Sequence, residues 1–261
     1  MVFAMMRLSM LSYHRDRDEP PEFRGKSLDM AKTFRHSMAQ CLIFDDFTKP
    51  HRYLLETLVL HLQGEYSRSN DSEVSIWILS GMIVRLGMRM GYHRDCKIFP
   101  NISTFQGEMR RRVWTWVRHA DLLFSFQLGL PSIIRSGDSD TEFPRNLYDE
   151  DFDEDSTELP PERPLSEPTP VSYIIVHAHL STVFSQVLEL SQKAKGTSYD
   201  EVMEMDSALR QARDTIPEWL RVKPMSECEN DSTSLIINRF AVCIYTSCIL
   251  SIHSLLTWRT F

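Results

Sequence analysis

Histidine, cysteine and acidic side chains most often catalyse reactions or bind metals, and this chain contains all of them. Their spacing matches no arrangement for either task. His177 and His179 lie two positions apart on a predicted helix, so their side chains face different directions and cannot share a metal ion. Cys243 and Cys248 are too far apart for a Cys-x-x-Cys pair. We therefore expect no catalytic residue, no metal site, no cofactor site and no enzyme.

Three consecutive arginines, Arg110, Arg111 and Arg112, offer anion-binding chemistry. Consecutive helical residues point in different directions, so the three cannot form one row along a nucleic-acid backbone. We expect at least one of them to pair with acids inside the domain and the others to be solvated. Asp121 lies three residues beyond Arg118, and we expect it to anchor an arginine from its own helix or from the turn at 93–95.

The overall composition is that of a globular protein with a sizeable hydrophobic core. A net charge of −7 disfavours direct binding of nucleic acid, which depends on Lys and Arg contacts to phosphates. Five scattered cysteines indicate free thiols in a reducing compartment. The apolar run 235–256 is interrupted by Asn238, Arg239 and His253, so it predicts a buried helix and no membrane span.

The hydrophobic pattern predicts an all-α protein, an irregular multi-helix bundle with a long acidic loop. Residues 1–25 are expected to form a disordered leader, because residues 12–25 are charged and interrupted by proline. Residues 26–261 are expected to form one helical regulatory domain that contains the loop at 132–168. The expected helices span residues 27–44, 48–66, 74–90, 107–128, 169–195, 200–216 and 232–257.

Two of these helices position the arginines. The helix at 74–90 is apolar nearly all round, so we expect it inside the bundle, with Gly81 and Gly87 allowing close helix contacts. The helix at 107–128 carries an apolar stripe and ends at Gly129, with Pro131 preventing its continuation. Bundles often place ligands between helices, which leaves open a cavity lined by Met82, Met88, Met90, Trp116 and Phe124. Side chains at this spacing more often fill a core.

Eleven residues in these two helices and the turns after them, here named the signature residues, form a specific pattern. The run Gly-Met-Arg-Met-Gly-Tyr-His-Arg-Asp ends at residue 95, and Glu-Met-Arg-Arg-Arg-Val-Trp ends at residue 114. The pattern resembles the middle homology region of fungal zinc-cluster (Zn2Cys6) transcription factors, over at least residues 50–190. It departs from the family at Thr115, Leu122 and Leu130, where Trp, Arg and Arg are usual. The signature residues are His93, Arg94, Asp95, Glu108, Arg110, Arg111, Arg112, Trp114, Asp121, Gly129 and Pro131.

The resemblance implies an all-α regulatory domain of a nuclear protein that modulates transcription by RNA polymerase II. It implies contacts with other protein segments or the transcription machinery, and leaves open a homodimer, a heterodimer and a small-molecule effector. The family's zinc cluster needs six closely spaced cysteines, which are absent, so zinc and DNA contacts belong to a domain outside this chain. Two alternatives remain: a small-molecule-binding helical protein or enzyme, and a stand-alone dimerisation partner of intact factors. The ending Ile252–Phe261 departs from the family, which predicts a truncated or mis-spliced product.

Overall fold

The computed structural model describes residues 1–68, 74–191, 198–229, 231–232, 235–243 and 246. These residues form helices and connections without a strand, which confirms the all-α prediction. Residues 235–243 are also helical, and the Ser232 hydroxyl accepts a hydrogen bond from the Leu235 amide at 3.2 Å. The predicted cap at 70–73 and the C-terminal residues 247–261 lie outside the described residues. The elements are α1 (Val2–Asp16), α2 (Ser27–Phe44), α3 (Leu54–Tyr66), α4 (Val74–Arg89), η1 (Cys96–Ile98), α5 (Thr104–Gln127), η2 (Asp149–Asp151), α6 (Ser172–Ser191), α7 (Tyr199–Asp214), η3 (Glu218–Leu220) and η4 (Met225–Glu227).

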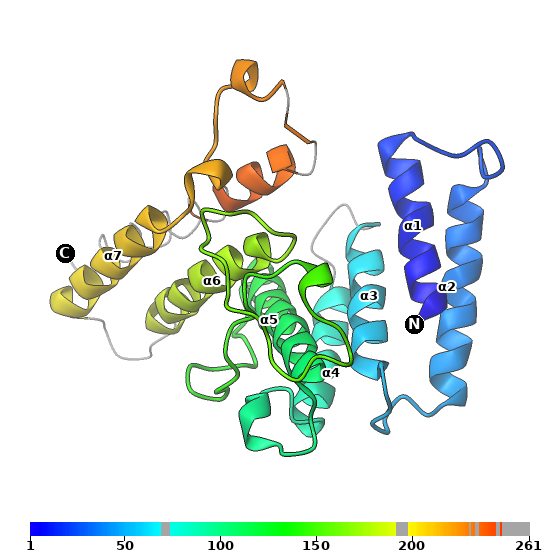
Figure 1. Ribbon diagram of the computed structural model, residues 1–261, viewed down its shortest axis with the longest axis horizontal. Coiled ribbons are helices and arrows are strands. Elements are labelled where there is room, and N and C mark those ends of the chain that lie inside the picture. The colour runs from blue at the N-terminus through cyan, green and yellow to red at the C-terminus, as the bar shows by residue number, and fades with distance from the viewer. Residues whose placement is uncertain (69–73, 192–197, 230, 233–234, 244–245, 247–261) are drawn as a thin grey trace.

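The helices pack one against the next from one end of the molecule to the other (Figure 1). The α1–α2 pair stands at one end and contacts α3, mainly through α1. Helices α3, α4 and α5 pack together in the middle, α6 packs on α5, and α7 packs on α6 at the far end. Helix α5 therefore lies between two groups of helices and contacts both.

Two hydrophobic clusters are buried among the described residues, and α5 contributes to both. The first cluster is formed by the inward faces of α3, α4 and α5, with Trp114 fully buried within it. The second cluster is formed mainly by α6, α7 and the segment after α7, together with Leu122 of α5. Because one helix contributes to both clusters, the two faces of α5 connect the middle of the domain to the α6–α7 end.

Glycines end both helices that carry the signature residues, as predicted. Gly91 follows α4 with φ +76° and Gly129 follows α5 with φ +68°, a left-handed conformation that glycine adopts without strain. The Tyr92 amide donates to the Gly87 carbonyl at 2.9 Å, and the Leu130 amide donates to the Ser125 carbonyl at 2.9 Å. These backbone contacts satisfy carbonyls at each helix end and set the direction of the chain that follows.

The prediction of a disordered leader is wrong, because residues 2–16 form α1. Its buried residues Ala4, Arg7 and Met10 recur every three positions, so they share one face. The Arg7 side chain is 2% exposed; its Nη2 lies 3.0 Å from Glu65 Oε1 and its Nη1 3.0 Å from His61 Nδ1 on α3. The charge at position 7 interrupts the apolar pattern in the sequence, but in the fold it joins α1 to α3.

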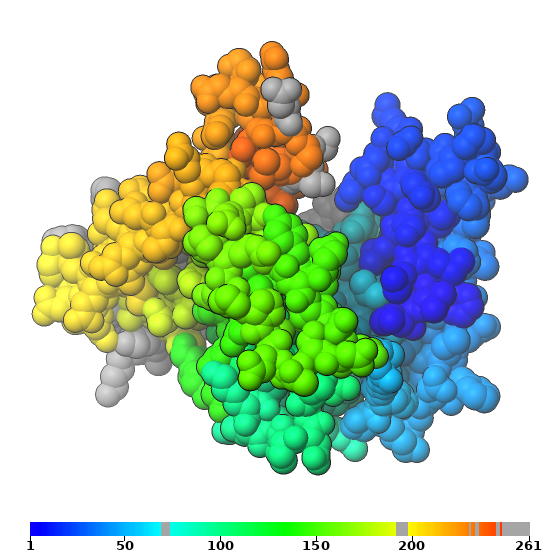
Figure 2. Space-filling view, viewed as in Figure 1, coloured from blue at the N-terminus to red at the C-terminus, as the bar shows by residue number. Residues whose placement is uncertain are grey.

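The chain between α5 and α6 contains little regular structure beyond the short helix η2. It nevertheless packs onto the domain, because Leu147 and Phe152 are buried. The Asn146 Nδ2 group donates to three backbone carbonyls between residues 163 and 167 at 3.0–3.2 Å. In Figure 2 this segment, in green, covers the middle of the visible face. It therefore forms part of the folded domain.

Candidate functional site

Asp95 and Arg111 form a buried ion pair between the turn after α4 and the first half of α5. Arg111 Nε donates to Asp95 Oδ2 at 3.0 Å and Arg111 Nη2 donates to Oδ1 at 2.9 Å, a bidentate contact. The amides of Lys97 and Glu142 donate to the same carboxylate, each at 3.0 Å. Burial alone would raise the pKa of the Asp95 carboxyl, but Arg111 and the two amides outweigh it and hold the pKa well below its usual range. Asp95 therefore stays ionised and receives four N–H hydrogen bonds.

The same ion pair fastens the segment that follows α5, and we name the whole contact the clasp: Arg94, Asp95, Arg111, Asp140 and Glu142. Arg111 Nη2 lies 2.9 Å from Glu142 Oε2. The Asp95 amide donates to Asp140 Oδ1 at 2.8 Å, and Arg94 Nη2 lies 2.9 Å from Asp140 Oδ2. The clasp therefore joins three parts of the chain that are distant in the sequence.

Trp114 forms a second connection between the same three parts. Its indole Nε1 donates to the Ser139 hydroxyl at 2.8 Å, and that hydroxyl donates to the His93 carbonyl at 2.9 Å. The His93 ring lies 6.3 Å from the Trp114 ring. A Cβ atom on Gly87 would lie 2.9 Å from this indole, so α4 and α5 approach as closely as predicted at this glycine.

Glu108 and Arg112 form an ion pair one turn apart on α5, with Glu108 Oε1 3.2 Å from Arg112 Nε. Glu108 is 1% exposed and also accepts a hydrogen bond from the Arg145 amide at 3.1 Å. Burial raises the pKa of the Glu108 carboxyl. Arg112 Nη1 lies 2.5 Å from Asp149 Oδ1. This pair fixes the segment between α5 and α6 at a second place.

Arg110 completes the triplet with a different contact. Its Nη2 donates to the Met90 carbonyl, and its guanidinium carbon lies 4.4 Å from the centre of the Tyr92 ring. The expectation that at least one arginine pairs with internal acids is therefore confirmed by Arg111 and Arg112. The expectation that the others are solvated is wrong, because all three are engaged within the domain.

Asp121 does not anchor an arginine, which corrects the sequence prediction. Its Oδ2 atom accepts hydrogen bonds from the Ser132 hydroxyl at 2.5 Å and from the amides of Ile133 and Ile134 at 2.9 and 3.0 Å. These donors lie immediately beyond Gly129 and the exposed Pro131. Asp121 therefore fixes the direction in which the chain leaves α5. It does not form the expected ion pair with Arg118.

The alternative of a cavity lined by Met82, Met88, Met90, Trp116 and Phe124 does not hold, and the favoured interpretation of these side chains as core does. Phe124 is buried in the first hydrophobic cluster, and the other four side chains pack against that cluster. They fill the space between α3, α4 and α5 with one another. The spacing of the methionine and aromatic residues therefore indicates a hydrophobic core. Methionine suits this position because its flexible side chain fills irregular gaps.

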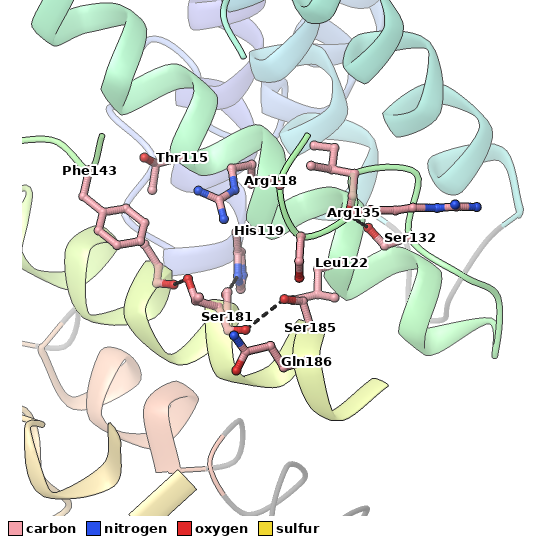
Figure 3. Close-up of a pocket in the computed structure, with 15 residues that line it drawn as sticks. Thr115, Arg118, His119, Leu122, Ser132, Arg135, Phe143, Ser181, Ser185 and Gln186 are labelled. Atoms are coloured by element: carbon pink, nitrogen blue, oxygen red, sulfur yellow. Dashed lines mark hydrogen bonds between the residues drawn. The ribbon is translucent and has the colours of Figure 1, made fainter. Parts of the chain in front are cut away.

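A cavity of about 170 Å³ lies elsewhere, between α5, α6 and the segment 132–143. Figure 3 shows the Arg118 guanidinium between the rings of Phe143 and His119, whereas Arg135 points away from the other labelled residues. Sequence reasoning did not identify this cavity, because its walls come from three separate segments. The lining residues are Thr115, Arg118, His119, Leu122, Ser132, Ile134, Arg135, Ser136, Gly137, Phe143, Ala178, Ser181, Thr182, Ser185 and Gln186.

Two histidines meet beside this cavity. The rings of His119 and His177 lie 4.9 Å apart, and His119 Nδ1 lies 3.0 Å from the Ser181 hydroxyl oxygen. Burial lowers the pKa of His119 to about 4 and, with the neighbouring His119, lowers the pKa of His177 to about 3. Both imidazoles are therefore neutral near pH 7 and contribute no cation to the cavity.

Residues 2–221 match the sequence profile of the fungal specific transcription factor domain. The chain belongs to this family. The domain is 43% identical over 225 residues to the Zn(2)-C6 fungal-type transcription factor pigI of Monascus ruber, covering 86% of this chain and 28% of that protein. It is 41% identical over 245 residues to transcription factor phm2 of a Pyrenochaetopsis species, covering 92% of this chain and 32% of that protein. No solved structure matches it.

A third relative, the pyrrolocin cluster transcription factor fsdR of a fungal species, is 40% identical over 84% of this chain and 28% of its own length. The domain thus spans about a third or less of the length of these curated relatives. Its described residues contain no group of three potential metal ligands, so the cysteines described here do not fit the family's zinc cluster. Within the same residues, no helix has the length and apolarity needed to cross a membrane.

Proposed function

We propose that this domain is the regulatory region of a nuclear fungal transcription factor and modulates transcription by RNA polymerase II. The observation that carries the proposal is the family match over residues 2–221, together with relatives that are named transcription factors. The pyrrolocin cluster transcription factor among these relatives supports a role in controlling a gene cluster of that kind. DNA binding, with its zinc, is assigned to a domain outside this chain.

The domain acts without catalysis and without a cofactor of its own. The arginines and acids of the clasp support this proposal, because they are occupied by one another and by backbone amides. Such groups hold segments in place and are not aimed at a substrate. A regulatory domain of this kind works by presenting one arrangement of its helices to the rest of the protein. The clasp maintains that arrangement.

Its partners are other protein segments or the transcription machinery, with a second copy or an intact relative as a further partner. Apolar side chains exposed on the first two helices support protein contacts: Val2, Met5, Ile43 and Phe44 are 65%, 51%, 72% and 91% exposed. A stand-alone dimerisation partner is the alternative form of this function. Size-exclusion chromatography with light scattering separates a monomer from a homodimer.

A reporter assay tests the proposed function. The 261-residue chain is fused to an unrelated DNA-binding domain and expressed in yeast beside a reporter gene. We expect reporter output to differ at least severalfold from that of the DNA-binding domain alone, and Asp95→Asn to abolish the difference at matched protein level. Arg94→Gln, which removes a half-exposed ion pair, is the matched control and should retain it. Equal output from the fusion and the bare DNA-binding domain would contradict the proposal.

A further inference from the structure

Arg118 differs from Arg111 and Arg112, which precede it on α5. Arg111 and Arg112 each lie within ion-pair distance of two carboxylates. Within the described part of the chain, Arg118 has no carboxylate at that distance. Its guanidinium carbon lies 5.8 Å from the centre of the Phe143 ring. Asp121, one turn further along, is occupied by the donors at 132–134. Arg118 is thus a half-buried cation with no acidic partner among the described residues.

This arrangement costs free energy, because a guanidinium taken partly out of water loses hydration. Burial lowers the pKa of Arg118, and no neighbouring acid offsets the effect. An anion that pairs with Arg118 would restore the lost interactions through charge-assisted hydrogen bonds. The side chain faces the cavity between α5 and α6, so the cavity is the place from which such an anion would reach it (Figure 3).

The remaining walls of the cavity favour an anion with an apolar body. Leu122, Ile134 and Phe143 supply apolar surface, and hydroxyl groups of α5 and α6 supply hydrogen-bonding atoms. The carboxylate of Glu189, on the nearby face of α6, already accepts from the Ser136 amide at 3.1 Å and the Ser136 hydroxyl at 3.0 Å. The volume of about 170 Å³ is smaller than the roughly 300–1,000 Å³ of pockets for drug-sized molecules. A ligand of a few carbon atoms or one ring fits it.

Thr115 and Leu122 of α5 both line the cavity. A tryptophan at 115 would occupy part of the space, and an arginine at 122 would replace an apolar wall with a second cation. The size and polarity of the cavity therefore depend on these two side chains.

We propose that the cavity between α5, α6 and the segment 132–143 binds a small organic carboxylate. The carboxylate group pairs with Arg118, and the apolar body lies against Leu122 and Phe143. Because α5, α6 and the segment held by Asp121 all line the cavity, the ligand joins these three parts of the domain. The effect of this ligand on transcription rests on the proposed function, whereas its binding to the cavity does not.

Calorimetric titration of the full 261-residue chain tests the site. The probes are benzoate, succinate, inorganic phosphate and the uncharged benzamide. We expect saturable binding of benzoate or succinate, with benzamide at least about tenfold weaker, because a charge-assisted contact is lost. No saturation by either carboxylate, benzamide binding as tightly as benzoate, or phosphate binding more tightly than both carboxylates would overturn the assignment.

Three variants locate the binding. Arg118→Gln should weaken carboxylate binding at least about tenfold, with a ligand-free melting temperature no lower than that of the unchanged chain. Arg210→Gln, which removes an exposed ion pair with Asp206 on α7 away from the cavity, should bind within about twofold of the unchanged chain. Thr115→Trp should abolish binding by filling the cavity. Unchanged affinity in Arg118→Gln, or a lower melting temperature of that variant without ligand, would refute the role of Arg118. If the reporter fusion gives the same output as the bare DNA-binding domain while the chain still binds the carboxylate, the result counts against the proposed function alone.

Discussion

Replacing Asp95 with Asn tests whether the clasp holds the domain together. Asp95 is 6% exposed, and its carboxylate receives two hydrogen bonds from Arg111 and two from backbone amides. Breaking a buried ion pair from one side costs about 3–5 kcal/mol. Arg111 keeps Glu142 at 2.9 Å, and Glu142 is half-exposed, so we expect the lower end, about 3 kcal/mol. That is a large share of the roughly 5–15 kcal/mol by which domains are stable.

Urea unfolding measures this loss, with tryptophan fluorescence as the signal because Trp114 is fully buried beside the clasp. The melting temperature should fall by roughly 6–12 °C, at about 2–4 °C per kcal/mol for a chain of this size. Arg94→Gln removes a half-exposed ion pair from the same cluster and should cost less than about 1 kcal/mol. If Asp95→Asn and Arg94→Gln destabilise the domain equally, the clasp does not have the energetic role inferred here.

Two further predictions concern acid sensitivity and helix packing. His119 and His177 are neutral in the folded domain, with pKa values of about 4 and 3, and titrate near pH 6.5 when unfolded. The unfolded chain thus binds more protons below pH 6.5, so the free energy of unfolding should fall from pH 7 to pH 5. In urea unfolding at several pH values across that range, the His177→Phe variant should lose up to about 2 kcal/mol less unfolding free energy than the unchanged chain. An unchanged pH dependence would contradict a neutral, buried His177. In the same assay Gly87→Ala should destabilise by about 1–3 kcal/mol, because its Cβ would meet the rigid Trp114 ring at 2.9 Å. Gly81→Ala should be near neutral, since its Cβ would meet only the mobile ends of Ile133 and Arg85, at 3.0 and 3.2 Å; equal losses at both glycines would argue against the close packing at Gly87.

Helix positions followed from the sequence where the signal is local. The apolar period of residues 74–90 placed α4 correctly, and Gly91 and Gly129 ended α4 and α5 as expected. Such features depend on the spacing of side chains along one helix and on the backbone freedom of one residue, so neighbouring residues suffice to predict them. The close approach at Gly87 could be inferred for the same reason, because glycine inside a helix has a cost that packing must offset.

The first helix was missed because its signal is not local. Arg7 breaks the apolar stripe of residues 2–16, and its partners Glu65 and His61 lie more than fifty positions away. A buried charge looks unfavourable until the group that neutralises it is known. The sequence lists both charges, but only the packing of α1 on α3 brings them together.

The sequence by itself determined the family, the helical class and three of the five clasp residues, Arg94, Asp95 and Arg111. Which acid each arginine meets was decided by the tertiary structure, because the segment between α5 and α6 has no period and its position depends on hydrogen bonds to distant side chains. For that reason Asp121 holds a backbone turn, and Arg118 faces a cavity with walls from three segments. Contacts of this kind depend on distances in space, which spacing along the chain does not encode.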